Sequence, residues 1–324
     1  MKSEDFRFII EYAIKAPSGH NTQPWKFENT EEGIVIHPDF SRSLPIVDKE
    51  NYELYISLGC ALENLLIAAS HKDYQYTVQY PDNAPSCIKV KLTKSETNET
   101  IKRPLLDYIA TRQVTKSKYN DRSITAEDLK KLTSCFSVDG VSVLLLDGKE
   151  RFEKIIPYII EANSLQFKNK KFISELVNWI RFSKREAEKT RDGIWSATMA
   201  MPGLGKFVGS LIMKNFVTAK SEAKRLTDLL EHTRGIAVFI TDNNNAITWV
   251  KTGQAFQQFG LTATMLGISH AHLNMPCEEL AVREEMAKEL NIEAKHPLLL
   301  IRYGYADKMP YSFRRTIDEV KYPG

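Results

Sequence analysis

The chain has 324 residues, of which 43% are hydrophobic and 26% charged, a composition typical of a soluble globular protein. The length fits two average domains or one large one. With 44 basic and 41 acidic residues, the net charge of +3 is too balanced to favour nucleic acid or a membrane surface as a partner.

Targeting and redox signals point to a reducing compartment. The sequence has no run of eighteen apolar residues, so we expect no membrane span. The start, MKSEDFRFIIEYAIKAP, places acids before any apolar region and does not resemble a signal peptide. Four cysteines lie far apart with no CxxC spacing (Cys60, Cys87, Cys135, Cys277). They predict reduced thiols in a cytoplasmic protein.

In the first hundred residues, helical and strand patterns alternate. Ser3 is expected to cap a helix with an apolar stripe from Phe6 to Ile14, which Pro17 ends. Two short strands follow, at 25–28 and 33–37, and then a long, mostly apolar helix at 52–71. Residues 75–80 and 87–93 alternate as strands around a turn.

A second block begins near residue 101. It predicts a helix at 105–110 and another opened by a capping box of Thr125 and Asp128. A strand at 141–146 precedes a mostly helical stretch, 149–232, which is interrupted by DGIWSATMAMPGLGKF. The strand GIAVFIT, a long helix at about 246–267, a short strand, a helix opened by Pro276 and the strand LLLIRYGYA then follow, before a basic SFRR tail.

The two long helices share a sequence pattern. LGCALENLLIAA (58–69) and TGQAFQQFGLTA (252–263) match at one offset of 194 residues, which pairs Gly59 with Gly253 and Ala61 with Ala255. Small residues on one face allow two helices to pack closely. We therefore expect a chain of two related halves around a pseudo-two-fold axis.

The stretch APSGHNTQPW (16–25) is rich in neutral hydrogen-bonding groups directly after a helix. The simplest interpretation is a solvated turn. The alternative is a binding loop: Asn21 and Gln23 carry amides, Ser18 and Thr22 carry hydroxyls, and Gly19 allows close backbone approach. Such uncharged donors and acceptors suit a flat polar heterocycle, such as a flavin edge, better than a phosphate or a metal.

This loop resembles the flavin-contacting loop of the nitroreductase family, roughly A-P-S-x-x-N-x-Q-P-W. Seven of its ten positions match, and PDFSRSLPIVDKENYELYISLGCALENLLIAA resembles the longer, twin-domain Acg-like branch. The resemblance implies an α+β, nitroreductase-like fold with two tandem halves, 1–100 and 101–324, as an intrachain pseudo-dimer. It also implies one composite FMN site per chain, because no A-P-S loop is found in the second half.

The same resemblance implies which residues contact FMN. TRQVTK (111–116) resembles the family's R-x-S-x-R phosphate segment, with Val114 in place of the hydroxyl residue. Arg112, Lys116 and either Arg314 or Arg315 are then the phosphate ligands, although Arg112 and Lys116 alone would be read as a solvated helix end. The predicted cofactor contacts are Pro17, Ser18, Gly19, His20, Asn21, Gln23, Arg112, Lys116, His270, His272, Arg314 and Arg315.

His270 and His272 share one face of a predicted strand that the family runs past the flavin N5. They could donate there, or one could simply be buried. A metal site with Cys277 is rejected because no standard spacing or fourth ligand exists. PGLGKFVG is rejected as a dinucleotide motif, since it is one residue too long and follows no strand. We interpret about 163–218 as a helical insertion, either a lid over the flavin or a hairpin covering the core.

Two functions follow from this resemblance. The first is an FMN-dependent oxidoreductase that takes hydride from NADH or NADPH and reduces nitroaromatic or quinone-type acceptors, with no protein nucleophile. The alternative is a protein that binds and sequesters FMN with little turnover, since Val114 and the insertion could hinder catalysis. A monomer suffices to build the site, and a homodimer stays open.

Overall fold

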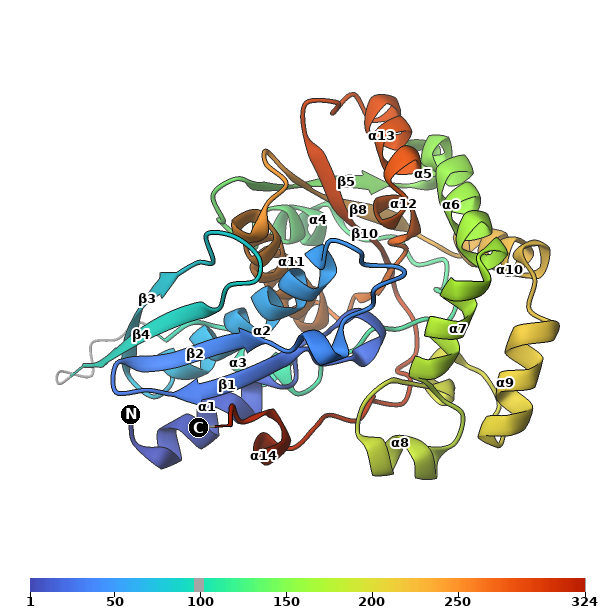
Figure 1. Cartoon of the computed structure of the whole chain (residues 1–324). Coiled ribbons are helices and arrows are strands. Elements are labelled where there is room, and N and C mark those ends of the chain that lie inside the picture. Colours follow the sequence, from blue (N-terminus) through green and yellow to red (C-terminus); the bar gives the residue numbers. More distant parts are fainter. Residues whose placement is uncertain (96–101, 324) are drawn as a thin grey trace.

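Two antiparallel sheets, one from each half of the chain, flank a central pair of long helices (Figure 1). The computed structural model describes residues 1–95 and 102–323. The fold is α+β, as predicted. One core is shared by the two halves, because apolar side chains of both long helices and both sheets belong to a single buried cluster.

The first sheet has the strand order β1-β2-β4-β3, with every neighbouring pair antiparallel. Its elements are α1 (Ser3–Ala13), η1 (Gly19–Asn21), β1 (Trp25–Asn29), β2 (Gly33–Pro38), η2 (Phe40–Arg42), α2 (Tyr52–Ser70), β3 (Tyr74–Gln79) and β4 (Ile88–Lys94). Each predicted element of this half is found within one or two residues. The cap of α1 is wrong: Lys2 is the N-cap, without a side-chain bond, and Ser3 is the first helical residue.

The second sheet has the order β5-β8-β10-β9 and is likewise antiparallel. Outside the connection from β5 to β8, this half contains α3 (Leu106–Ile109), α4 (Ala126–Thr133), β5 (Val141–Asp147), β8 (Gly235–Thr241), α11 (Ala246–Met265), β9 (Ser269–His272), α12 (Met275–Glu278), α13 (Leu280–Glu289), β10 (His296–Gly304) and α14 (Ile317–Val320), and α14 packs against α1 and β1 of the first half. The Thr125 hydroxyl accepts the Asp128 N–H at 3.1 Å, as expected of an N-cap.

The two sheets repeat one topology. In each, the first two strands are followed by a long helix, α2 or α11, and then by the third and fourth strands in the order 1-2-4-3. The helices meet at the paired glycines. A Cβ on Gly59 would lie 2.0 Å from the Val250 carbonyl oxygen, and a Cβ on Gly253 would lie 2.0 Å from that of Ile56. This repeat supports two related halves, while the boundary near residue 100 stays a prediction.

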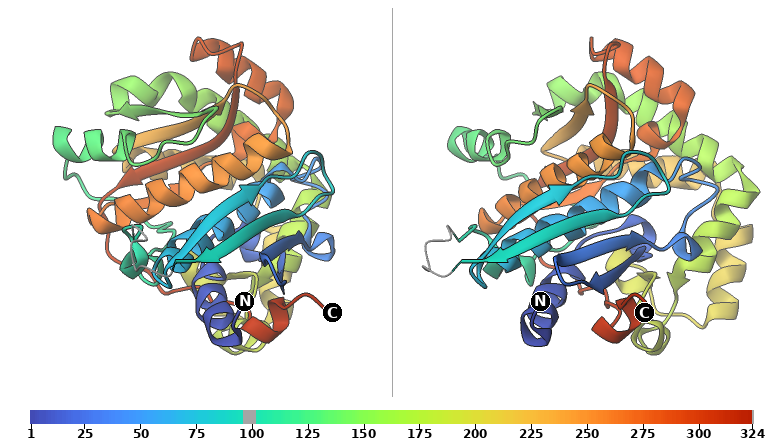
Figure 2. Two further views of the ribbon diagram at one scale, coloured as in Figure 1. Left: turned by 90° about the vertical axis from the view of Figure 1, so that its left-hand side faces the viewer. Right: turned by 60° about the vertical axis from the view of Figure 1, so that its left-hand side comes forward.

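The connection from β5 to β8 carries a large helical segment. It contains α5 (Lys149–Phe152), η3 (Glu153–Ile155), α6 (Ile156–Lys168), α7 (Lys170–Trp179), β6 (Ile180–Arg181), α8 (Lys184–Thr190), β7 (Ile194–Trp195), η4 (Ser196–Met199), α9 (Lys206–Asn215) and α10 (Ala219–Glu231). α6 and α10 pack on the second sheet, whereas α7, α8 and α9 lie at the edge of the molecule (Figures 1 and 2). The outer helices fall inside the predicted insertion, 163–218.

After β10, the chain returns to the first half. The Tyr322 N–H donates to the Phe27 carbonyl at 2.8 Å, and the Tyr322 ring stacks on His37 at 3.8 Å. The tail therefore fastens the second half to the first sheet. α2 is long and apolar enough to cross a membrane, but 94% of it is buried inside the molecule, as in a core helix.

Candidate active site

A cavity of about 380 Å³ lies where the two halves, the helical segment and the C-terminal tail meet. This volume falls within the range of about 300–1,000 Å³ common for ligand pockets. One stripe of α2 forms a wall with Glu53, Ile56, Ser57 and Cys60. Most of the remaining lining comes from residues within 17–21, 112–116, 271–275 and 310–314, and from helices α6, α7 and α10.

The loop after α1 has a strained backbone. The backbone φ angles are positive at His20 (47°), Asn21 (55°) and Gln23 (54°), a conformation that residues other than glycine rarely adopt. Such conformations persist only where surrounding contacts hold them, and they cluster at functional sites. The Ser18 hydroxyl supplies one such contact by accepting the Gln23 N–H at 2.9 Å. Pro17, Ser18, Gly19, His20 and Asn21 all line the cavity.

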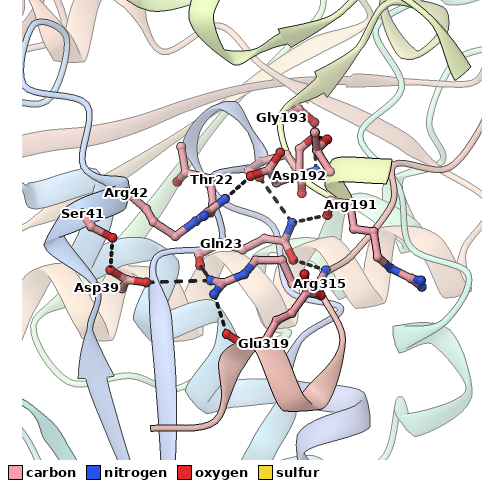
Figure 3. Close-up of polar contacts among 12 residues, drawn as sticks. Thr22, Gln23, Asp39, Ser41, Arg42, Arg191, Asp192, Gly193, Arg315 and Glu319 are labelled. Carbon is pink, nitrogen blue, oxygen red and sulfur yellow. Dashed lines mark hydrogen bonds and ion pairs between the residues drawn. The ribbon is translucent and has the colours of Figure 1, made fainter. Parts of the chain in front are cut away.

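Gln23 and Arg315 instead form a network behind the loop (Figure 3). The Gln23 Nε2 donates to the Arg191 carbonyl at 2.9 Å, and its Oε1 accepts the Arg315 N–H at 2.8 Å. Arg315 also donates to the carbonyls of Gln23 and Glu319, at 3.1 and 2.6 Å. Neither Gln23 nor Arg315 lines the cavity. Both join the loop to the helical segment and the tail, and the geometry gives no support to their predicted cofactor contacts.

Asn21 lies at the cavity wall and orients an arginine. Its Nδ2 donates to the carbonyls of Gly193 and Phe313, at 2.9 and 3.2 Å, while its Oδ1 accepts from Arg314 Nη1 at 2.9 Å. The amide is therefore occupied by protein groups. Of the two tail arginines, Arg314 lines the cavity.

One end of the cavity is cationic. Arg112, Lys116 and Arg314 all line the cavity, and their predicted contacts with a phosphate stay predictions. Arg112 is 5% exposed; its Nη2 donates to the Lys15 carbonyl at 3.3 Å, and its Nε and Nη1 have no hydrogen-bond partner among the described residues. Desolvation by the cavity walls, with Arg225 and Arg302 nearby, lowers the pKa of Lys116 to about 8, although the side chain itself is exposed to the cavity. A cationic cluster that includes buried N–H groups without partners among the described residues favours an anionic ligand.

Arg302 belongs to the same end and was not predicted. It is 1% exposed, its guanidinium lies 3.9 Å from the Tyr119 ring centre, and its Nη2 donates to the carbonyls of Thr115 and Ser117 at 3.2 and 2.8 Å. Its Nε and Nη1 have no partner among the residues described. A charge inside the apolar strand LLLIRYGYA was the available sequence signal, because buried charges are rare unless they have a role.

The histidines near the cavity are neutral at physiological pH. His272 faces the cavity, where burial and the Lys116 and Arg112 charges lower its pKa to about 3. Burial, assisted by Lys116, lowers the pKa of His20 to about 4. His270 is buried behind the wall, 5.9 Å from the Phe256 ring, and both of its ring nitrogens lack a partner in the described part of the chain. Only His20 and His272 therefore reach a ligand in the cavity.

The opposite end carries carboxyl groups that the sequence analysis missed. Glu53 and Glu278 line the cavity and hydrogen-bond to each other. Asn274 Nδ2 donates to Glu53, and Gln166 Nε2 donates to Glu278 at 2.5 Å. Spacing alone could not reveal this pair, since its members lie 225 positions apart and meet only through the fold.

Known proteins resemble this chain along nearly its whole length. No family model matches the sequence. Two Mycobacterium tuberculosis H37Rv proteins that carry NAD(P)H nitroreductase names do match: Rv3131, 21% identical over 98% of this chain and 91% of its own length, and Acg, 22% identical over 96% and 93%.

Solved structures give partial likenesses. The FMN-dependent nitroreductase NfnB from Mycobacterium smegmatis, in complex with NADPH, aligns with a TM-score of 0.45 and 15% identity over 67% of this chain and 96% of its own. A nitroreductase-like protein from Bacillus cereus aligns at 0.42 and 14%, over 69% and 97%. The sequence matches to Rv3131 and Acg span nearly the full length of each chain, so this chain is similar along its whole length to proteins named NAD(P)H nitroreductases, in agreement with the resemblance of the 16–25 loop.

Proposed function

We propose that this chain binds FMN in the cavity and is an oxidoreductase. It takes reducing equivalents from NADH or NADPH and passes them to nitroaromatic or quinone-type acceptors. The names of the near-full-length relatives Rv3131 and Acg support this class of reaction. The 16–25 loop, whose pattern resembles that of flavin-binding relatives, forms part of the cavity wall and supports the choice of cofactor.

The cationic end carries the proposal. Arg112 Nε and Nη1 and Arg314 Nε are buried donors without partners among the described residues, and Lys116 stands beside them. Leaving such donors unpaired costs free energy, so the cavity is complementary to a dianionic phosphate. We assign the phosphate to Arg112, Lys116 and Arg314, because Arg315 points into the network with Gln23.

The ring would occupy the space between the 17–21 loop and the β9 end. Bound there, FMN would accept a hydride and donate it again. The chain's own contribution is positioning and charge: Lys116 and Arg302 place positive charge at one end, and neutral His20 and His272 can donate hydrogen bonds without adding charge. The walls all come from one chain, so a monomer can form the site.

A second function is favoured by one observation. Phe167, Phe172, Leu176 and Met199 of the helical segment line the cavity, so this segment occupies space through which a nicotinamide would have to enter. A closed segment would make the protein an FMN-sequestering protein with little turnover. With four free cysteines, we place either function in the cytoplasm.

The test is a visible spectrum after FMN is added and the protein is desalted, followed by anaerobic NADH and NADPH. A retained flavin band that bleaches within the mixing time supports the oxidoreductase. A retained band that persists supports sequestration. Loss of the band on desalting would refute FMN binding.

A further inference from the structure

The carboxyl end of the cavity has its own ligand chemistry. Glu53 lies in the first turn of α2 and Glu278 on α12, and Gln166 of α6 fastens Glu278 through a 2.5 Å hydrogen bond. The pair is close to the candidate flavin loop: a Cβ on Gly19 would lie 3.4 Å from Glu53 Oε2. The two carboxyls are therefore at the wall of the ring space.

Few cations balance these carboxyls. Asp48 lies behind Glu53 and accepts the N–H groups of Glu53 and Leu54, at 3.2 and 2.9 Å. The other titratable groups that face the pair or its neighbours are Tyr52, Cys277, Glu279, Lys49 and Arg283. Lys49 acts on Glu279 and Arg283 on Cys277, so neither pairs with Glu53.

Burial and the contact between the two carboxyls favour a proton shared by the pair. Burial, and then the charges of Glu278 and Asp48, raise the pKa of Glu53 well above its ordinary value. Two carboxylates in contact cannot both ionise at low cost, and one shared proton relieves the repulsion. The site thus offers a carboxylic O–H to the cavity.

A second donor at this end is independent of the acids. Asn163, one turn before Gln166 on α6, is 3% exposed and lines the cavity. Its Nδ2 has no hydrogen-bond partner within the part of the chain that the structure describes. Buried amide donors are almost always paired, so this one indicates a missing acceptor.

We propose that Asn163 and the Glu53–Glu278 pair bind an uncharged acceptor oxygen of the substrate, a quinone carbonyl or a nitro oxygen, and that the pair protonates it. This inference rests on the proposed oxidoreductase function and specifies its substrate end. An anionic oxygen is disfavoured here by the acids, whereas a neutral oxygen can accept from both donors.

The proton and electron count closes for a quinone. The acceptor takes one hydride, which reduced nicotinamide nucleotide supplies by way of FMN, and one proton. The carboxylic O–H bond breaks as the new O–H bond forms at the carbonyl oxygen. The pair is left with both carboxyls ionised, and water reprotonates it after the hydroquinone leaves.

The test uses the FMN-loaded protein reduced with dithionite, so nicotinamide access is not needed. Duroquinone, whose ring has no position open to the thiol of Cys60, and nitrobenzene are the probes. We expect the oxidised form of the variant E53Q/E278Q to bind duroquinone with a Kd within threefold of the wild-type value. Its anaerobic flavin reoxidation should be at least tenfold slower and should lose the pH dependence seen in wild type. Asn163→Leu should weaken binding of both probes at least tenfold.

Glu285→Gln, an exposed carboxylate on α13 paired with Lys288, is the matched control and should leave binding and reoxidation unchanged. Wild-type reoxidation in E53Q/E278Q would overturn the proton role, and wild-type affinity in Asn163→Leu would overturn the oxygen site. If only duroquinone responds, the site is a carbonyl site. Binding of the probes to flavin-free protein, monitored by tryptophan fluorescence, tests the site even if FMN is not retained.

Discussion

Replacing Arg112 by methionine tests the phosphate assignment most directly. Methionine keeps much of the side-chain bulk and removes the charge. The guanidinium is 5% exposed, and two of its nitrogens lack partners among the described residues. The one hydrogen bond of its guanidinium within the described part of the chain, to the Lys15 carbonyl, is long at 3.3 Å. In the absence of ligand, the charge therefore has poor compensation.

The expected changes in FMN affinity and in stability follow from this poorly compensated charge. A hydrogen bond to a charged group contributes about 1.5–3 kcal/mol, so the loss of one such bond to phosphate should raise the FMN Kd roughly 10- to 150-fold. Without FMN, removing a buried, poorly paired charge should not destabilise the fold. We expect the free energy of unfolding of the apoprotein to rise by about 1 kcal/mol.

Flavin fluorescence titration gives the Kd, and urea unfolding without FMN gives the stability. Arg185→Met on α8, where the arginine is exposed, is the control and should change neither quantity. An FMN affinity within threefold of wild type would refute the phosphate role. An apoprotein destabilised by more than about 2 kcal/mol would show that Arg112 is structural instead.

Three further outcomes are expected. Lys116→Gln should remove a rise in FMN Kd between pH 7.5 and 9.5, because the wild-type lysine loses its charge above a pKa of about 8; titrations across that range decide it. Gly253→Ala should lower the free energy of unfolding by about 1–3 kcal/mol, since its Cβ would lie 2.0 Å from a backbone oxygen. The control Gly205→Ala, whose Cβ would meet nothing within 4 Å, should change the free energy of unfolding by less than about 0.5 kcal/mol. Urea unfolding measures both. The folded-state pKa of Glu53 and of Glu278 is raised above the unfolded value, so the native pair binds extra protons and its own contribution to stability should fall as pH rises from 5 to 8, whereas the neutral His20, His270 and His272 contribute in the opposite direction. The free energy of unfolding of wild type minus that of E53Q/E278Q isolates the pair, and this difference should be smaller at pH 8 than at pH 5.

Local patterns predicted the elements because a strand or helix that buries one face alternates or repeats in sequence, and one that is buried on all sides is a continuous apolar run. The alternation at 87–93 matches β4, the short strand predicted at 33–37 matches β2, and the strand GIAVFIT becomes β8, buried along its whole length. Sheet order was not predicted, since it depends on contacts between distant segments. The short strands β6 and β7, two residues each, are too brief for any periodicity to reveal.

The candidate site was predicted where one motif carried the information. Residues 17–21, Arg112, Lys116 and Arg314 do meet at one cavity, although their contacts with FMN stay predictions. The polar loop was expected to offer its amides to a ligand, but the amides of Asn21 and Gln23 hydrogen-bond to the segment 191–193 and to the tail. A side chain's partner is set by tertiary packing, which composition does not encode.

The repeated topology raises the question of why one cavity rather than two should bind a ligand. The 194-residue offset that pairs Gly59 with Gly253 also pairs Cys60, which faces the cavity, with Gln254. Gln254 is buried: Tyr80 donates to its Oε1 at 2.8 Å, and its Nε2 donates to Glu63 at 3.2 Å. Side chains of the first half thus fill the position that corresponds to the cavity wall. We infer that the pseudo-equivalent site has been closed by packing, so that FMN binding should saturate at one molecule per chain.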